Sequence, residues 1–252
     1  MLEKFFNFKN KIILITGCSG QIGQSIVSLF LGLGSKVYGL DIKSSKPKNN
    51  FSFIKCDITN QKSLKKTIDR IITKEKTIDI IINNAGISTF GDFKKRNDDE
   101  LNKIFKTNVT SMINLIKHYL IAFDKKKLKS AKIINIGSIY GFLSPDFKIY
   151  EKGDRFSPEI YGATKSAIIQ LTKYYAVLLA NRNINVNCIS PGGIINKDLQ
   201  SKSFIKKYVK RVPKKRMGHP SDLLTSIIFL ASESSEYITG QNIIIDGGLS
   251  LK

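Results

Sequence analysis

The sequence predicts an α/β protein, a single domain built on a doubly wound, mostly parallel sheet of seven strands with helices on both faces. Short runs rich in Ile and Val alternate with longer segments of helical periodicity. The short runs are almost continuously apolar, which is typical of strands buried on both faces of a parallel sheet. With 252 residues, 42% of them hydrophobic, and no internal repeat, one domain over residues 1–252 is expected.

The elements follow in a regular order. Strands are expected at Ile12–Thr16, Lys36–Leu40, Phe51–Cys56, Ile78–Ile82, Lys132–Ile136, Asn185–Ile189 and Asn242–Ile245. Helices are expected between them at Ile22–Leu33, Gln61–Thr73, Asp99–Phe123, Ile160–Ala180 and Ser221–Ser232. Right-handed crossovers between the parallel strands then produce the doubly wound arrangement.

Two irregular stretches interrupt this alternation, an insertion at about 142–159 and a segment at about 193–218. Each follows the end of an expected strand. Ligands of doubly wound sheets bind beyond the carboxyl ends of the strands, so both stretches are expected to border a binding site.

The positive charge is large but spread along the chain. There are 41 Lys and Arg residues against 20 Asp and Glu, a net charge of +21, and only six arginines. Nucleic-acid-binding surfaces rely on arginine forks, so a nucleic-acid partner is not expected, although anionic small substrates would be favoured. Three scattered cysteines without metal-ligand spacing indicate a reduced, cytoplasmic compartment and no metal site. No signal peptide and no apolar run long enough to span a membrane are recognised.

A Gly-rich turn lies between the first strand and the first helix. It contains Gly17, Ser19, Gln21, Ile22 and Gly23. Such a turn lets the backbone approach a pyrophosphate, and the helix that follows offers free N–H groups and a partial positive charge. The pattern is typical of a Rossmann-like dinucleotide-binding fold.

Three further strand ends carry candidate cofactor-binding residues. Asp41 ends the second strand, where a carboxylate accepts from both adenosine ribose hydroxyls and repels a 2′-phosphate, so NAD(H) is expected over NADP(H). Lys43 and Lys46 follow and would soften this preference. Asp57, followed by Ile58, either meets the adenine edge or caps the helix that begins near Asn60. After the fourth strand come the residues Asn84, Ala85 and Gly86.

Tyr161 and Lys165 have the spacing that places two side chains on one face of a helix, about 6 Å apart. A phenol ordinarily has a pKa of about 10, and a neighbouring cation favours the phenolate and lowers that pKa. Tyr161 is therefore a candidate for proton exchange with an alcohol oxygen, and Ser138 for a hydrogen bond to the same oxygen. A surface Tyr–Lys pair is the alternative interpretation of this motif taken alone.

These motifs, in this order, resemble the short-chain dehydrogenase/reductase family, mainly its classical type. The resemblance covers essentially the whole chain. It rests on the Gly-rich turn, Asn83-Asn84-Ala85-Gly86, Asn108, Ser138, Tyr161 with Lys165, Pro191-Gly192, and the ending Ile238-Thr239-Gly240-Gln241 with Asp246-Gly247-Gly248.

The resemblance implies a role for each matching residue. Tyr161 is expected to be the general acid/base, Lys165 to lower its pKa and hold the nicotinamide ribose, and Ser138 to stabilise the reacting oxygen. Asn108 is expected to bend its helix and support a proton path. Pro191, Gly192 and Ile194 join the expected cofactor site. The family also implies a homotetramer or homodimer built by the two long helices and the last strand.

Three departures from the family pattern stand out. Gln21 occupies the place of a glycine in the classical type, and Gly17, Gly20 and Gly23 instead copy the spacing of the extended branch, which includes sugar-nucleotide epimerases. Asn196 replaces a threonine that contacts the nicotinamide amide. The insertion between Ser138 and Tyr161 is longer than usual in the family and is expected to form a wall over the substrate.

The predicted function is NAD(H)-dependent exchange of hydride between a secondary alcohol and a ketone. A polar or anionic sugar-type substrate, such as a sugar phosphate or a surface-glycan precursor, is expected. The resemblance implies that the segment at 193–218 is a substrate lid, and this segment is rich in cations, although a solvated helix face explains these equally. The alternatives are a 3-oxoacyl thioester reductase, which usually uses NADPH, and an epimerase that retains NAD. The cations of the segment at 193–218 are Lys202, Lys206, Lys207, Lys210, Arg211, Lys214, Lys215 and Arg216.

The scattered Phe and Tyr side chains are interpreted as core or interface.

Overall fold

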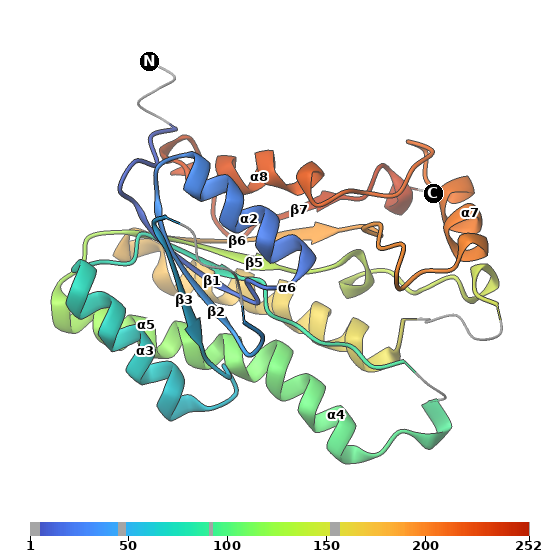
Figure 1. Cartoon of the computed structure of the whole chain (residues 1–252), viewed down its shortest axis with the longest axis horizontal. Coiled ribbons are helices and arrows are strands. Elements are labelled where there is room, and N and C mark those ends of the chain that lie inside the picture. Colours follow the sequence, from blue (N-terminus) through green and yellow to red (C-terminus); the bar gives the residue numbers. More distant parts are fainter. Residues whose placement is uncertain (1–5, 45–48, 91–92, 152–156, 252) are drawn as a thin grey trace.

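The protein is described from a computed structural model, which covers residues 6–44, 49–90, 93–151 and 157–251 (Figure 1). Seven strands form one sheet in the order β3-β2-β1-β4-β5-β6-β7, and every neighbouring pair is parallel. The strands are β1 Ile12–Thr16, β2 Lys36–Asp41, β3 Phe51–Lys55, β4 Ile80–Asn83, β5 Ala131–Ile136, β6 Ile184–Pro191 and β7 Asn242–Ile245. The predicted α/β, doubly wound, Rossmann-like fold is confirmed.

Helices cover both faces of the sheet (Figure 1). On one face α2 and α8 pack against the strands, and on the other face α3, α5 and α6 do so. The helices are α2 Gln21–Gly32, α3 Gln61–Glu75, α4 Asp98–Phe105, α5 Ser111–Lys126, α6 Glu159–Leu179, α7 Lys202–Arg211 and α8 Ser221–Ala231. Short 3₁₀ turns lie at Phe93–Lys95, Ile139–Gly141, Phe147–Ile149, Ala180–Arg182, Glu233–Ser235 and Leu249–Leu251.

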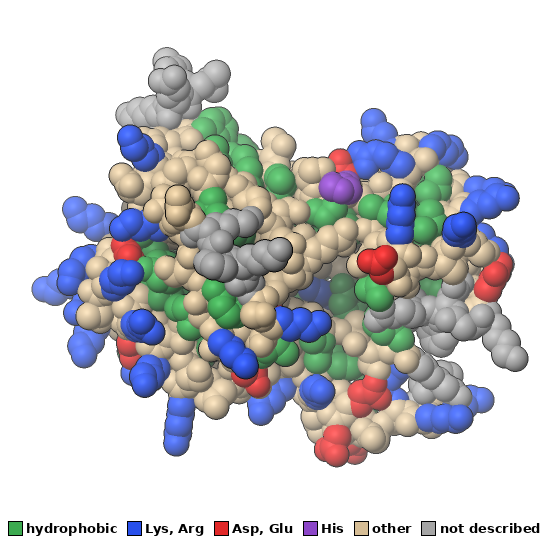
Figure 2. Space-filling view, viewed as in Figure 1, with side chains coloured by type: hydrophobic (Ala, Val, Ile, Leu, Met, Phe, Trp, Pro, Cys, Tyr) green, Lys and Arg blue, Asp and Glu red, His purple; other side chains and the backbone are tan. Residues whose placement is uncertain are grey.

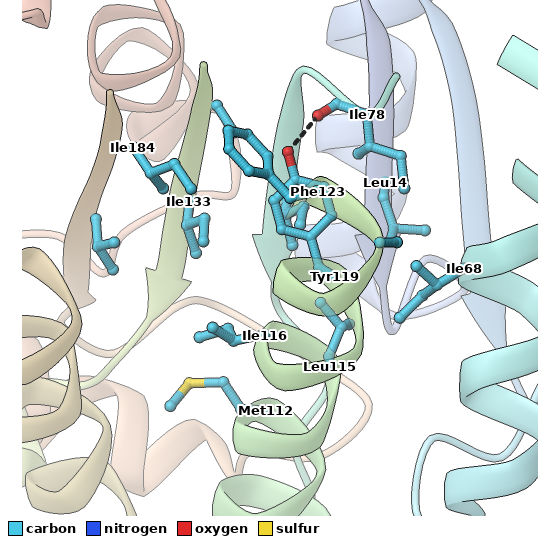
Figure 3. Packing of buried hydrophobic residues seen from close by; sticks show 14 of the residues in the cluster. Leu14, Ile68, Ile78, Met112, Leu115, Ile116, Tyr119, Phe123, Ile133 and Ile184 are labelled. Atoms are coloured by element: carbon cyan, nitrogen blue, oxygen red, sulfur yellow. Dashed lines mark hydrogen bonds between the residues drawn. The ribbon is translucent and has the colours of Figure 1, made fainter. Parts of the chain in front are cut away.

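The larger core cluster fills the space between the sheet and α3, α5 and α6. Figure 3 shows Met112, Leu115, Ile116, Tyr119 and Phe123 of α5 pointing into it. The only polar atom that the Tyr119 side chain brings is its hydroxyl, which donates to the carbonyl oxygen of Ile78 at 2.9 Å. Each fully buried aliphatic side chain in such a cluster stabilises the fold by about 2 kcal/mol. The cluster fixes α5 and α6 against the strands whose carboxyl ends carry the candidate site.

The helix predicted at Asp99–Phe123 is not continuous, and that prediction is corrected here. A π-helical turn, Lys106–Thr110, separates α4 from α5. Asn108 lies within this turn, and its buried amide bonds to backbone atoms of Ile87 on the neighbouring segment. Helical periodicity alone gives no sign of such a turn, because the cause is a tertiary contact.

The two irregular stretches meet beyond the carboxyl ends of β5 and β6. The segment at 193–218 contains α7, a helix that the sequence analysis did not assign. A third core cluster joins α7 to the insertion through Ile149, Tyr208, Val212 and Met217. Within the insertion, 152–156, including Lys152 and Arg155, lie outside the described residues.

On the face drawn in Figure 2, Lys and Arg side chains lie along the left, lower and right parts of the outline rather than in one cluster. In the described part of the chain, no helix is long and apolar enough to cross a bilayer. The same residues contain no group of three or more His, Cys, Asp or Glu side chains arranged to hold a metal ion.

Candidate active site

The Gly-rich turn between β1 and α2 is packed too tightly for side chains at two of its glycines. Gly17 has a φ of +68°, and a Cβ there would lie 2.8 Å from the Cα of Ala85. A Cβ at Gly23 would lie 2.2 Å from the carbonyl oxygen of Gly17. Gly20 differs, because the nearest atom to its Cβ would be the same oxygen at 3.5 Å. Gly17 and Gly23 therefore bring strand and helix together, and Gly20 leaves the outer surface of the turn bare.

The first turn of α2 suits an anion. Its N-cap residue is Gly20 in an extended conformation, no side chain caps this end, and the first turn has no acidic residue. The backbone N–H groups at a helix start lack helical partners and carry the positive end of the helix dipole. A pyrophosphate fits this end of the helix.

Asp41 lies beside the turn, and two backbone donors fix its carboxylate. Oδ2 accepts from the N–H of Ser19 at 3.0 Å, and Oδ1 accepts from the N–H of Lys43 at 3.0 Å. Ser19 Oγ donates in turn to the carbonyl oxygen of Lys43 at 2.9 Å. The carboxylate is thus held at the rim of the cleft described below, where ribose hydroxyls are suitable donors to it. Lys46 lies outside the described residues.

The end of β4 is tied to the same turn by a residue that the sequence analysis did not single out. Thr16 Oγ1 accepts from the N–H groups of Asn84 and Ala85, at 3.2 and 3.1 Å. Asn84 Nδ2 donates to the carbonyl oxygens of Thr16 and Gly17, at 3.1 and 2.9 Å. These bonds close the floor of the crevice between β1 and β4, where the strand order reverses.

A cleft of about 790 Å³ extends over the carboxyl ends of β1 to β4. The predicted cofactor residues that line it are Gly17, Ser19, Gln21, Ile22, Gly23, Asp41, Asp57, Ile58, Asn84, Ala85 and Gly86. Asp57 Oδ1 accepts from the N–H and the hydroxyl of Thr59, at 2.9 and 2.8 Å. The N-cap of α3 is Asn60, whose side chain accepts from the N–H of Ser63. Asp57 therefore does not cap that helix.

Tyr161 and Lys165 project from α6 one turn apart. Lys165 is 4% exposed, and its Nζ donates to the carbonyl oxygen of Ile136 at 2.7 Å. The same Nζ lies 5.6 Å from the centre of the Tyr161 ring. Ser138 follows β5 and is buried, and its Oγ accepts from the N–H of Tyr140 at 3.2 Å. The turn after Ser138 packs directly on α6, since a Cβ at Gly141 would lie 2.8 Å from the carbonyl carbon of Lys165.

A second cavity, of about 400 Å³, adjoins the cleft. The predicted residues in its wall are Ile22, Asn84, Gly86, Ser138, Tyr161, Lys165, Pro191, Gly192 and Ile194. Ile22, Asn84 and Gly86 line the cleft as well, so the two spaces meet at these residues. Three of the four predicted catalytic residues therefore face the cavity that continues the cleft.

Asn108 stands behind these two spaces rather than in their walls. Its Oδ1 accepts from the N–H of Ile87 at 2.8 Å, and its Nδ2 donates to the carbonyl oxygen of Ile87 at 2.9 Å and to Thr164 Oγ1 at 3.1 Å. Thr164 Oγ1 donates to the carbonyl oxygen of Tyr161 at 2.8 Å. Asn108 thereby links the segment after β4 to the turn of α6 that carries Tyr161.

Two of the residues that depart from the family pattern organise the segment after β6. Gln21, in place of a glycine, donates through Nε2 to the carbonyl oxygen of Ile195 at 2.8 Å. Asn196, in place of a threonine, accepts through Oδ1 from the N–H of Asp198 at 3.2 Å. The Gly-rich turn and the start of the segment at 193–218 are therefore in direct contact.

Aromatic residues, which the sequence analysis assigned to core or interface, form much of the cavity wall. Tyr140, Tyr150, Phe204 and Tyr208 all line the cavity. The rings of Tyr150 and Phe204 are stacked, with centres 5.2 Å apart. The position of Tyr140, two residues after Ser138, was the one signal in the sequence that pointed to this site.

The cations of the segment at 193–218 do not line this cavity. Among the described residues in its wall, Lys165 is the only Lys or Arg. Two of the cations pair with carboxylates of the insertion and a third with Asp222. The pairs are Lys207–Glu151 at 2.9 Å, Arg211–Asp146, and Arg216–Asp222 at 2.6 Å.

Comparisons with known proteins agree with this geometry. A family model described as enoyl-(acyl carrier protein) reductase matches residues 19–250. The 3-oxoacyl-[acyl-carrier-protein] reductase FabG of Chlamydia pneumoniae is 32% identical, over 95% of this chain and 97% of the relative.

Two solved structures extend the comparison. A short chain dehydrogenase from Leptospira borgpetersenii with bound NAD+ is 42% identical, with a TM-score of 0.91 and coverage of 97% of this chain and 94% of that chain. The ligand-free aldohexose dehydrogenase of Thermoplasma acidophilum is 27% identical, with a TM-score of 0.85 and coverage of 98% and 97%.

The fold, the dinucleotide cleft and the adjoining cavity define a nicotinamide-dependent oxidoreductase. Within that class, the chain belongs to the short-chain dehydrogenase/reductase family.

Proposed function

We propose that this protein is an NAD(H)-dependent oxidoreductase that interconverts a secondary alcohol and a ketone. The observation that carries the proposal is that Ser138, Tyr161 and Lys165 line one cavity, which joins the cleft beside Asp41. A nicotinamide dinucleotide bound along that cleft would supply or accept the hydride. The protein contributes orientation and the handling of one proton.

Each catalytic role follows from the environment of its residue. Tyr161 is the general acid/base, because its hydroxyl belongs to a side chain that faces the cavity and lies beside an ammonium group. Lys165 is held by the carbonyl oxygen of Ile136, and its ammonium group would hold the nicotinamide ribose of a bound cofactor. Ser138 stabilises the reacting oxygen. Asn108 positions Tyr161 through Thr164 and supports the proton path.

The preference for NAD(H) rests on Asp41. Its carboxylate is fixed at the cleft by Ser19 and Lys43, and a 2′-phosphate placed there would meet a like charge. The 42% identical dehydrogenase from Leptospira borgpetersenii was crystallised with NAD+, which supports the same choice. Lys43 contacts Asp41 through its backbone N–H. The proposed preference for NAD(H) therefore depends on the Asp41 carboxylate and not on the charge of the Lys43 side chain.

A sugar-like, polar substrate is proposed over a 3-oxoacyl thioester. The aldohexose dehydrogenase among the similar structures supports the first choice. The 3-oxoacyl-[acyl-carrier-protein] reductases at about 30% identity favour the second choice, and they keep it as the runner-up. The expected anionic group stays a prediction without support from the cavity wall, where Lys165 is the only cation among the described residues.

We also propose a homo-oligomer that works in the cytoplasm. The outer face of α6 leaves Tyr174, Val177 and Leu178 exposed at 59%, 83% and 51%. Contiguous exposed apolar side chains on one helix are typical of a surface that another protein covers. Sedimentation of the full chain would reveal a dimer or tetramer.

The test is a comparison of wild type with Tyr161→Phe. NAD+-linked oxidation is measured over sugars, sugar phosphates and hydroxyacyl thioesters, with NADH binding measured separately. Loss of the phenol hydroxyl is expected to lower kcat by at least about 100-fold while NADH still binds. Tyr237→Phe, at a fully exposed position, is the matched control. Equal turnover by the Tyr161 variant would remove this tyrosine from its role. Retained NAD with no net oxidation would favour the epimerase alternative.

A further inference from the structure

The roof of the active-site cavity is a small structural unit of its own. The insertion and α7 pack through a core of Ile149, Tyr208, Val212 and Met217, separate from the two clusters that flank the sheet. Ion pairs on the outside join the same two segments, including Lys207 with Glu151, whose Oε1 also accepts from the hydroxyl of Ser203 at 2.6 Å. The roof is therefore apolar within and charged on its outer side.

An anion in this cavity would find little compensation from the described residues. Lys165 is the one cation in the wall, and its ammonium group already donates to Ile136 and stands beside Tyr161. Burying an anion without a charge partner is costly, so the described wall of this cavity favours an uncharged group. Lys214 and Arg216 instead line an adjoining cavity of about 430 Å³, which shares Gly192, Gly193, Ile194 and Tyr208 with this one. The polar side chains of the insertion and of the segment at 193–218 that line this cavity are Tyr150, Ser157, Gln200 and Tyr208, and Tyr140 adds a further phenol hydroxyl.

Tyr140 is the phenol closest in sequence to Ser138, and it enters the cavity from the 3₁₀ turn that packs on α6. Its hydroxyl lies 3.4 Å from the hydroxyl of Tyr150. Ordinary O–H···O bonds span about 2.5–3.0 Å, so this contact leaves room for a shorter bond to another oxygen. Burial, followed by the neighbouring Tyr150, raises the pKa of Tyr140. The phenol therefore stays protonated at working pH and is a hydrogen-bond donor.

Tyr150 comes from the other side of the roof. It lies in the insertion, and its ring stacks on Phe204 of α7. The contact between the two hydroxyls thus joins the catalytic turn to the roof. A substrate oxygen next to Tyr140 would accept a hydrogen bond from a residue on the 3₁₀ turn that follows β5. The contact with Tyr150 limits the positions that the Tyr140 ring can take.

We infer that Tyr140 is a substrate-binding residue whose hydroxyl donates to a second, uncharged oxygen of the substrate, apart from the oxygen that is oxidised or reduced. This inference rests on the proposed function. It assigns the substrate class as a neutral hydroxy alcohol, hydroxyketone or hydroxy ester rather than an anion or a simple alcohol.

The test uses four compounds that share one carbinol group. Butan-2-ol has no second oxygen, butane-1,3-diol and methyl 3-hydroxybutanoate have a neutral second oxygen, and 3-hydroxybutanoate has a carboxylate. The kcat/KM with NAD+ is measured for each compound on wild type, Tyr140→Phe and the control Tyr237→Phe. Calorimetry of the same compounds on the enzyme–NADH complex gives their affinities without turnover.

The expected result is a selective loss. Tyr140→Phe lowers kcat/KM and affinity for the two neutral dioxygen compounds at least about fivefold, the effect of one hydrogen bond, and changes the butan-2-ol values less than about twofold. Wild type prefers the methyl ester to the carboxylate. The inference would be overturned if Tyr140→Phe lost kcat/KM equally for every compound or for none of them. It would also be overturned if wild type preferred the carboxylate or bound none of the compounds. Failure of the proposed function would show separately, as full activity in Tyr161→Phe.

Discussion

Substituting Ala for Gly20 or for Gly23 gives the sharpest test of how the Gly-rich turn is packed, because the new Cβ has space at position 20 and none at position 23. In Gly23→Ala the new Cβ would lie 2.2 Å from the carbonyl oxygen of Gly17, more than 1 Å short of an ordinary 3.4 Å contact. That oxygen also accepts from the N–H of Gly20 at 3.2 Å and from Asn84 Nδ2 at 2.9 Å. The turn must therefore shift and strain or lose these two hydrogen bonds.

The magnitude follows from these contacts. Overpacking costs about 1–3 kcal/mol, and each weakened hydrogen bond adds about 1 kcal/mol. We expect Gly23→Ala to lower the free energy of unfolding by about 3–5 kcal/mol and to weaken NADH binding at least about tenfold. In Gly20→Ala the Cβ lies 3.5 Å from its nearest neighbour, and φ is −73°, so stability should change by less than about 0.5 kcal/mol. Its methyl group nevertheless lies in the cleft wall, so NADH binding should weaken.

The assay pairs urea denaturation with NADH titration by fluorescence on both variants. The expected pattern is loss of stability in Gly23→Ala alone and loss of NADH affinity in both variants. Wild-type stability in Gly23→Ala, or an equal loss in Gly20→Ala, would refute the packing argument. Unchanged NADH affinity in both variants would refute the assignment of the turn to the pyrophosphate.

Three other predictions concern the cofactor, the π-helical turn and alkaline pH. Asp41→Asn removes the charge that repels a 2′-phosphate, so the ratio of NADPH to NADH affinity should rise at least about tenfold, and an unchanged ratio would contradict this role. Asn108→Ala removes three hydrogen bonds of a buried side chain and should lower the free energy of unfolding in urea by about 2–4 kcal/mol, a loss below 1 kcal/mol being inconsistent with the contacts. Burial raises the pKa of Tyr38 and of Tyr208 from 10.0 to about 12, so the stability tied to their neutral forms is complete below pH 10 and is lost as pH rises toward 12. The urea midpoint should accordingly fall through that range, and a constant midpoint would count against it.

The strands were the part of the fold best predicted from the sequence. Ile12–Thr16 and Asn242–Ile245 have the predicted bounds, and the other strands differ by a few residues at their ends. Central parallel strands are buried on both faces, so their Ile-rich runs stand out without any knowledge of the tertiary structure. The Gly-rich turn and Asp41 could be placed for the same reason, since each directly follows such a run.

Features that depend on tertiary contacts could not be predicted in this way. The π-helical turn at Lys106–Thr110 depends on the hydrogen bonds between Asn108 and Ile87, which are far from each other in sequence. Helix α7 was not assigned because half of its residues are charged. It is held by the insertion through ion pairs and the cluster around Tyr208.

The aromatic cavity wall was missed for a related reason. Tyr140, Tyr150 and Phe204 come from three separate segments, and only the fold brings them together. The roles of Ser138, Tyr161 and Lys165 were argued from the spacing of Tyr161 and Lys165 and from the family resemblance, and they stay predictions.

A crystal structure of the protein with NADH tests the central claim most directly. The account predicts the pyrophosphate at the start of α2, the adenosine ribose on Asp41, and the nicotinamide ring in the 400 Å³ cavity beside the Tyr161 hydroxyl. A dinucleotide bound in the reverse direction, or a nicotinamide ring outside that cavity, would contradict it.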